Sequence, residues 1–72
     1  MAYRYVVFAP GYVKKEMKAK SMIDAARKFT GNNDIEKIRD DVNSFGMVCD
    51  CIVFKFDESD MSIPVSSASF GH

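Results

Sequence analysis

Two cysteines flank an aspartate in the most apolar run of the chain, MVCDCIVFKF, at residues 47–56. Thiols and carboxylates form disulfides, hold metals or act as nucleophiles, so this run is the first candidate for chemistry. If residues 47–56 form a strand, Cys49 and Cys51 point to the same face with their Cα atoms about 6.5–7 Å apart. That separation is outside the usual range, so a disulfide within the strand would require distortion.

The sequence lacks the further ligands that a metal site would need and the base that a catalytic thiol would need. Zinc motifs place two to four residues between paired cysteines, whereas Asp50 alone separates Cys49 from Cys51. A nucleophilic thiol needs a nearby base, and the only histidine is the last residue, His72. Free cysteine commonly packs as a small buried hydrophobe. We therefore interpret the pair as core residues and expect neither a metal nor a cofactor.

Motifs of other enzyme classes are also missing from the sequence. The glycines stand singly rather than in a phosphate-binding loop, and the serines near the C-terminus lack the GxSxG pattern of a nucleophile elbow. The acidic residues between 34 and 41 lack the regular oxygen spacing of a calcium loop. We therefore expect a protein without enzymatic activity.

Length and composition indicate one small domain. The chain has 72 residues, of which 47% are hydrophobic and 28% are charged, and no run approaches the length of an apolar membrane span. The opening residues lack the pattern of a secretory signal, so the two cysteines indicate a reducing, cytoplasmic location. Residues 1–30 carry seven basic and two acidic residues (+5), and residues 31–72 carry three basic and eight acidic residues (−5). This asymmetry either forms a basic face for an anionic partner or is neutralised within the fold.

The first part of the chain has the pattern of a hairpin followed by a helix. Residues 3–9 are rich in aromatic and β-branched types, Pro10-Gly11 favours a turn, and residues 13–20 alternate apolar and charged side chains. Ser21 is a good N-cap and Gly31 a good C-terminal stop. The apolar spacing between them predicts a helix over residues 22–30.

Apolar residues at helical spacing predict a second helix over residues 34–44, with Asn33 as its cap. Residues 47–56 are apolar on both faces, which predicts a central strand.

A short strand over residues 61–65 is expected at a sheet edge, because Pro64 cannot donate a hydrogen bond to a ladder. Residues 67–72 are expected to form a flexible tail beyond a single domain of residues 1–66. The expected fold is therefore α+β: a small antiparallel sheet of three or four strands with two short helices on one face, in the order ββααβ(β).

The functional prediction depends on which hairpin residues face outward. We expect Phe8 to pair opposite Val13, because this register gathers the more apolar set on the core side. The outer side then carries tyrosines interleaved with lysines. The predicted binding residues are Tyr3, Tyr5, Tyr12, Lys14, Lys18 and Lys20. A loop with an odd number of residues would exchange the faces and move the tyrosines to the core.

A face of tyrosines and lysines suits a protein partner, because tyrosine is enriched at interfaces and lysine suits their rims. We therefore expect an interaction module that binds a protein, or a second copy of itself, through this face or an open sheet edge. The alternative is single-stranded nucleic acid, whose bases stack on rings and whose phosphates attract ammonium groups. A third possibility, from genomic economy alone, is an inhibitor encoded by a phage or mobile element. The tyrosines can equally be solvated side chains that contact no partner.

Overall fold

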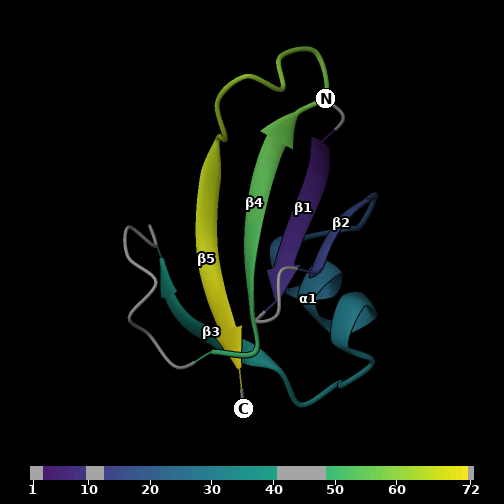
Figure 1. Ribbon diagram of the computed structural model, residues 1–72, viewed down its shortest axis with the longest axis vertical. Coiled ribbons are helices and arrows are strands. Elements are labelled where there is room, and N and C mark those ends of the chain that lie inside the picture. Colours follow the sequence, from purple (N-terminus) through teal and green to yellow (C-terminus); the bar gives the residue numbers. More distant parts are fainter. Residues whose placement is uncertain (1–2, 10–12, 41–48, 72) are drawn as a thin grey trace.

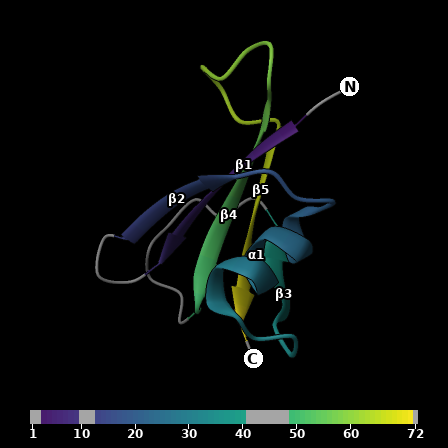
Figure 2. The ribbon, with the colours of Figure 1, turned by 90° about the vertical axis from the view of Figure 1, so that its right-hand side faces the viewer.

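The computed structural model describes residues 3–9, 13–40 and 49–71. They form one helix and a five-stranded antiparallel sheet with the strand order β2-β1-β4-β5-β3 (Figure 1). The elements are β1 (Tyr3–Ala9), β2 (Val13–Met17), α1 (Met22–Thr30), β3 (Glu36–Asp40), β4 (Cys51–Asp57) and β5 (Ser66–Gly71). The helix packs on one face of the sheet, against β1, β4 and β5 (Figure 2). The α+β class is confirmed, but the strand number and the element order differ from the prediction.

Helix α1 has the predicted bounds because its ends are set by neighbouring residues. The Ser21 hydroxyl accepts a hydrogen bond from the backbone N–H of Asp24 at 3.2 Å, which satisfies one of the free first-turn donors. The Asp24 carboxylate in turn accepts from the Lys20 backbone N–H at 3.0 Å. At the other end Gly31 has φ 71°, a left-handed conformation that costs glycine little.

The two predicted strands pair antiparallel, but β2 ends at Met17 rather than at residue 20, and the predicted register is wrong by one residue. The predicted turn at Pro10-Gly11 lies outside the described residues. Phe8 lies opposite Lys14 rather than Val13, and Tyr5 lies opposite Met17. Tyr5 and Val7 consequently belong to the core beneath α1. Both faces of β1 are apolar, so alternation within the strand does not choose between the two registers, and packing against the helix decides.

The predicted second helix is wrong over its described part, because Glu36–Asp40 forms the edge strand β3; residues 41–44 lie outside the described residues. The Asn32 side chain accepts from the Asp34 backbone N–H at 2.9 Å, which makes a turn where a helix start was expected. Ile35 is fully buried, and its carbonyl accepts from Arg27 Nε at 3.3 Å. A helix of eleven residues is marginal alone, whereas this segment gains a ladder with β5.

The predictions for the C-terminal part are also corrected. Residues 61–65 are not a strand, and the expected tail over residues 67–72 falls largely within β5, between β4 and β3. Cys51 lies opposite Phe70 in the β4–β5 ladder, and Phe70 is 1% exposed. The predicted strand over residues 47–56 begins at Cys51 in its described part and ends at Asp57.

The core lies between α1 and the sheet. Its buried members come from the helix, from β1, β4 and β5, and from the turn before β3. They are Tyr5, Val7, Ala25, Ala26, Ile35, Cys51, Val53, Ala68 and Phe70. In the part of the chain that the structure describes, no helix is long and apolar enough to cross a membrane.

Candidate functional site

The tyrosines predicted to bind a partner do not form an outer surface. Tyr5 is 3% exposed and lies in the core. Tyr3 packs against the same core, and Lys55 Nζ lies 4.0 Å from the centroid of its ring. Tyr12 lies outside the described residues. The predicted outward position of Tyr3 and Tyr5 is therefore wrong, because the one-residue change of register turns them toward the helix.

The predicted lysines are exposed, but each has a different environment. Lys14 Nζ lies 5.8 Å from the centroid of the Phe8 ring, and Lys14 is on the sheet face opposite α1. Lys18 Nζ lies 3.8 Å from Glu58 Oε1. Lys20 precedes α1, and its backbone N–H is bound by Asp24. The ring beside Lys14 is therefore that of Phe8, and the lysine over the Tyr3 ring is Lys55, which is not among the predicted binding residues.

The prediction that both cysteines are core residues is confirmed for Cys51 but not for Cys49. Cys51 is fully buried in the core, Cys49 is partly buried just before β4, and both thiols are free. Burial, with smaller contributions from Cys49 and Asp50, raises the pKa of Cys51 to about 11. Burial and Asp50 also raise the pKa of Cys49. Among the described residues no three potential ligands from His, Cys, Asp and Glu cluster to hold a metal.

We expect native Cys51 to resist alkylation. With a pKa of about 11, only about one thiol in a thousand is ionised at pH 8, and the thiolate is the reactive form. Mass spectrometry after iodoacetamide treatment should show modification of Cys51 at least about tenfold slower in the native protein than in urea. Rapid labelling of Cys51 in the folded protein would contradict its assignment to the core.

Among the described residues, most of the exposed large apolar side chains lie between β4 and β5. Met61, Ile63 and Val65 are 38%, 72% and 58% exposed, within the β4–β5 loop of residues 58–65. This loop extends past the end of the sheet in both views (Figures 1 and 2). Large apolar residues exposed close together on an ordered surface are unusual and often mark a contact site.

Two turns centred on aspartates shape the β4–β5 loop. Asp57 Oδ1 accepts from the Ser59 backbone N–H at 2.9 Å and from its hydroxyl at 2.8 Å. Asp60 Oδ1 accepts from the backbone N–H and the hydroxyl of Ser62 at 3.1 and 2.5 Å. The Asp60 backbone N–H donates to the Asp57 carbonyl, and the Val65 N–H to the Lys55 carbonyl at 2.7 Å, which closes the loop. Local side-chain bonds of this kind hold a loop without a core of its own.

The two aspartates remain charged at neutral pH. The Ser59 backbone N–H, followed by its hydroxyl, lowers the pKa of Asp57. The Ser62 hydroxyl, followed by its backbone N–H, lowers the pKa of Asp60. Both turns therefore stabilise the fold above the usual aspartate pKa and weaken as the pH falls through the lowered values.

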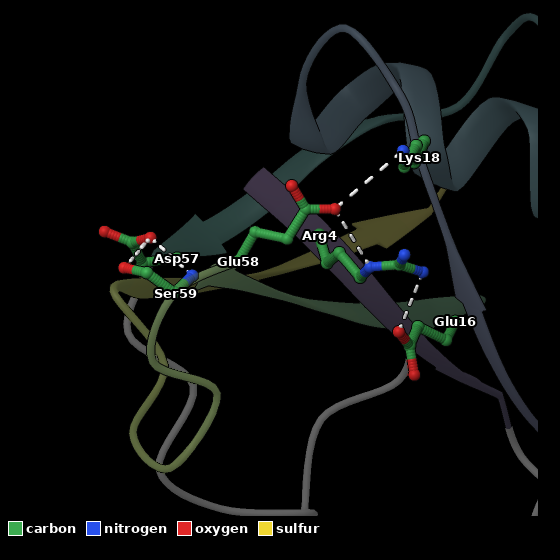
Figure 3. Close-up of polar contacts among 6 residues, drawn as sticks. All are labelled: Arg4, Glu16, Lys18, Asp57, Glu58 and Ser59. Atoms are coloured by element: carbon green, nitrogen blue, oxygen red, sulfur yellow. Dashed lines mark hydrogen bonds and ion pairs between the residues drawn. The ribbon is translucent and has the colours of Figure 1, made fainter. Parts of the chain in front are cut away.

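An ion-pair cluster holds the base of the loop against the first hairpin. Arg4 on β1 contacts Glu16 on β2 at 3.0 Å through Nη1 and Glu58 at 3.3 Å through Nε. Lys18 contacts the same oxygen of Glu58 at 3.8 Å (Figure 3). A single exposed ion pair contributes little stability, but here one arginine connects two strands and the loop. Lys18, predicted to bind a partner, therefore contacts the base of the loop.

The sequence of this loop has the pattern of a strand. Met61, Ile63 and Val65 alternate with polar residues and proline, which is the pattern of a half-buried strand. Pro64 and the preceding Asp57-Glu58-Ser59-Asp60 run favour a loop, and in that setting the same alternation leaves apolar side chains exposed. Whether Met61, Ile63 and Val65 are buried in a strand or exposed in a loop depends on where the last strand begins. It begins at Ser66, so all three lie in the loop.

Comparisons with protein-family models, with curated proteins and with solved structures found no match for this chain. The functional proposal therefore depends on the exposed groups and contacts described above.

Proposed function

We propose that this protein is a small non-enzymatic interaction module that binds a protein partner through its β4–β5 loop. The observation that carries the proposal is the exposure of Met61, Ile63 and Val65, at 38%, 72% and 58%, on a loop with fixed turns. Ile63 is the most exposed of the three and is the expected anchor. Burying a side chain of this kind in a partner contributes about 1.5–3 kcal/mol.

The internal contacts of the loop favour binding because the loop loses little further conformational entropy when it contacts a partner. A flexible loop loses conformational entropy when it binds, whereas one held by internal hydrogen bonds has lost much of it already. The Asp57 and Asp60 turns and the Glu58 contact with Arg4 supply such order here. The acidic residues beside the apolar ones favour a partner with an apolar pocket and a basic rim.

Nucleic-acid binding has no comparable support. That alternative required tyrosine rings beside lysines on an open sheet face. Tyr5 is buried, and Tyr3 packs against the core beneath Lys55. The protein-binding proposal needs neither ring.

To test the proposal, the tagged wild-type protein and a loop variant are each used to recover the partner from extracts of the source cells. The variant Met61→Ser/Ile63→Ser/Val65→Ser removes the exposed apolar groups while keeping the Asp57 and Asp60 turns. Recovery of the partner should fall at least about tenfold, since one well-buried apolar side chain exceeds that in free energy. Quantitative mass spectrometry of the bound proteins is the measurement.

The matched control is Ile38→Ser. Ile38 is also apolar and 48% exposed, but it lies on β3, away from the β4–β5 loop at the other end of the sheet (Figure 1). This variant should recover the partner at the wild-type level. Equal recovery by the loop variant and the wild type would contradict the proposed role of the loop.

A further inference from the structure

The sheet has two outer strands, and only one of them is suited to join a second copy of this chain. Its order places β2 at one end and β3 at the other. Each pairs on one side only among the described residues, with β1 and β5 respectively. Figure 2 views the molecule from the β2 side, where β2 crosses in front of β1. An unpaired strand edge is a template for another strand unless its side chains oppose this.

We propose that β2 pairs antiparallel with β2 of a second copy, which joins the two sheets into one. In an antiparallel pair, residues directly opposite each other point to the same face of the sheet. A twofold axis perpendicular to the sheet therefore relates the two copies. The register centred on Lys15 pairs all five residues of β2. It places Lys14 opposite Glu16 of the second copy, twice, and Val13 opposite Met17.

Neighbouring registers lack this complementarity. Shifting the axis to Lys14 places the two Lys14 residues opposite each other, and shifting it to Glu16 does the same for the two glutamates. Among the twofold registers that pair three or more residues of β2 with each other, only the one centred on Lys15 places opposite charges across the new ladder. Directly opposed side chains on a sheet are about 4.5–5.5 Å apart at Cβ, which is close enough for an ion pair.

The groups required for pairing are accessible. Lys14 and Glu16 are both exposed, on the sheet face opposite α1. Glu16 uses Oε1 to contact Arg4 at 3.0 Å. A carboxylate has a second oxygen with its own acceptor sites, so Glu16 can bind lysine of the second copy while keeping Arg4.

The other outer strand opposes self-pairing. A register centred on Ile38 places Glu36 opposite Asp40 and Lys37 opposite Arg39 of the second copy, so all its charged pairs repel. The ladder of β3 also shifts register between Lys37 and Arg39. Like charges directly opposite each other destabilise a sheet, and a bulge bends its edge. The charge order therefore selects β2.

The decisive measurement is sedimentation equilibrium of the full chain from about 10 μM to about 1 mM, a range that detects even weak dimers. The wild type should change from the monomer mass toward the dimer mass. Lys14→Glu and Glu16→Lys should each remain monomeric, because each places two pairs of like charges across the axis. The double variant Lys14→Glu/Glu16→Lys restores opposite charges and should dimerise again.

Two further variants separate edge pairing from a general effect of charge. Lys15→Thr removes the one like-charge pair on the axis and should tighten the dimer about threefold. Asp34→Lys reverses an exposed charge in the turn before β3, outside both outer strands, and should leave the dimer unchanged. A wild type that stays monomeric at about 1 mM overturns the proposal. A double variant that is folded by circular dichroism but fails to dimerise also overturns it.

This inference goes beyond the proposed function and uses a different surface. The variant Met61→Ser/Ile63→Ser/Val65→Ser should dimerise like the wild type, because the changed residues are not on β2. Partner recovery and sedimentation therefore report the two proposals separately.

Discussion

Replacing Phe70 with alanine is expected to remove a large part of the stability of the protein. Phe70 is 1% exposed and is the largest fully buried side chain among the described residues. Truncating a buried phenylalanine costs about 3–5 kcal/mol through lost burial and the cavity left behind. A domain of 72 residues has a total stability of only about 4–11 kcal/mol. Urea unfolding followed by circular dichroism measures the loss.

A milder variant keeps the prediction measurable if Phe70→Ala does not fold. Phe70→Leu retains most of the volume and should lower the free energy of unfolding by about 1–2 kcal/mol. Val65→Ala serves as the control because Val65 is 58% exposed, and it should stay within about 0.5 kcal/mol of the wild type. A small effect of Phe70→Ala would mean that residues 67–71 behave as the flexible tail expected from the sequence.

Replacing Tyr5 with alanine should cost about 3 kcal/mol or more in the free energy of unfolding. Tyr5 is 3% exposed within the core, where α1 covers the sheet. In the register expected from the sequence Tyr5 faces solvent, and the same substitution would then cost little. Thermal and urea unfolding distinguish the two arrangements.

Phe8→Ala is the informative comparison for Tyr5→Ala. Phe8 is only partly buried, on the opposite face, where its ring meets that of Phe54 edge-on at 5.4 Å between centroids. We expect Phe8→Ala to destabilise the protein less than Tyr5→Ala does. The opposite order would support the register in which Phe8 lies opposite Val13.

The cluster at the base of the β4–β5 loop depends on the same register. Arg4 and Glu16 lie on the face opposite α1, and their contact at 3.0 Å brings Arg4 toward Glu58. A shift of one residue would place Arg4 and Glu16 on opposite faces of the sheet. The hairpin register therefore decides both which residues are buried and how the loop is held.

The elements stabilised by local interactions are predictable from the sequence. Helix α1 has the predicted bounds because Ser21 and Gly31 act on groups within a few residues of each end. The strand over residues 3–9 also forms as predicted, because its aromatic and β-branched residues favour extended backbone whichever face is buried. The burial of Cys51 followed from its residue type and its apolar neighbours.

The remaining features depend on contacts between residues distant in sequence, which supply most of their stabilising energy. Glu36–Asp40 is a strand rather than a helix because it pairs with β5. Ser66–Gly71 has little intrinsic strand preference and becomes part of the sheet between β4 and β3, with Phe70 in the core. The hairpin register was ambiguous because both faces of β1 are apolar, and contact with α1 resolved it. Local spacing cannot encode these choices, since each depends on which partner strand or helix lies alongside.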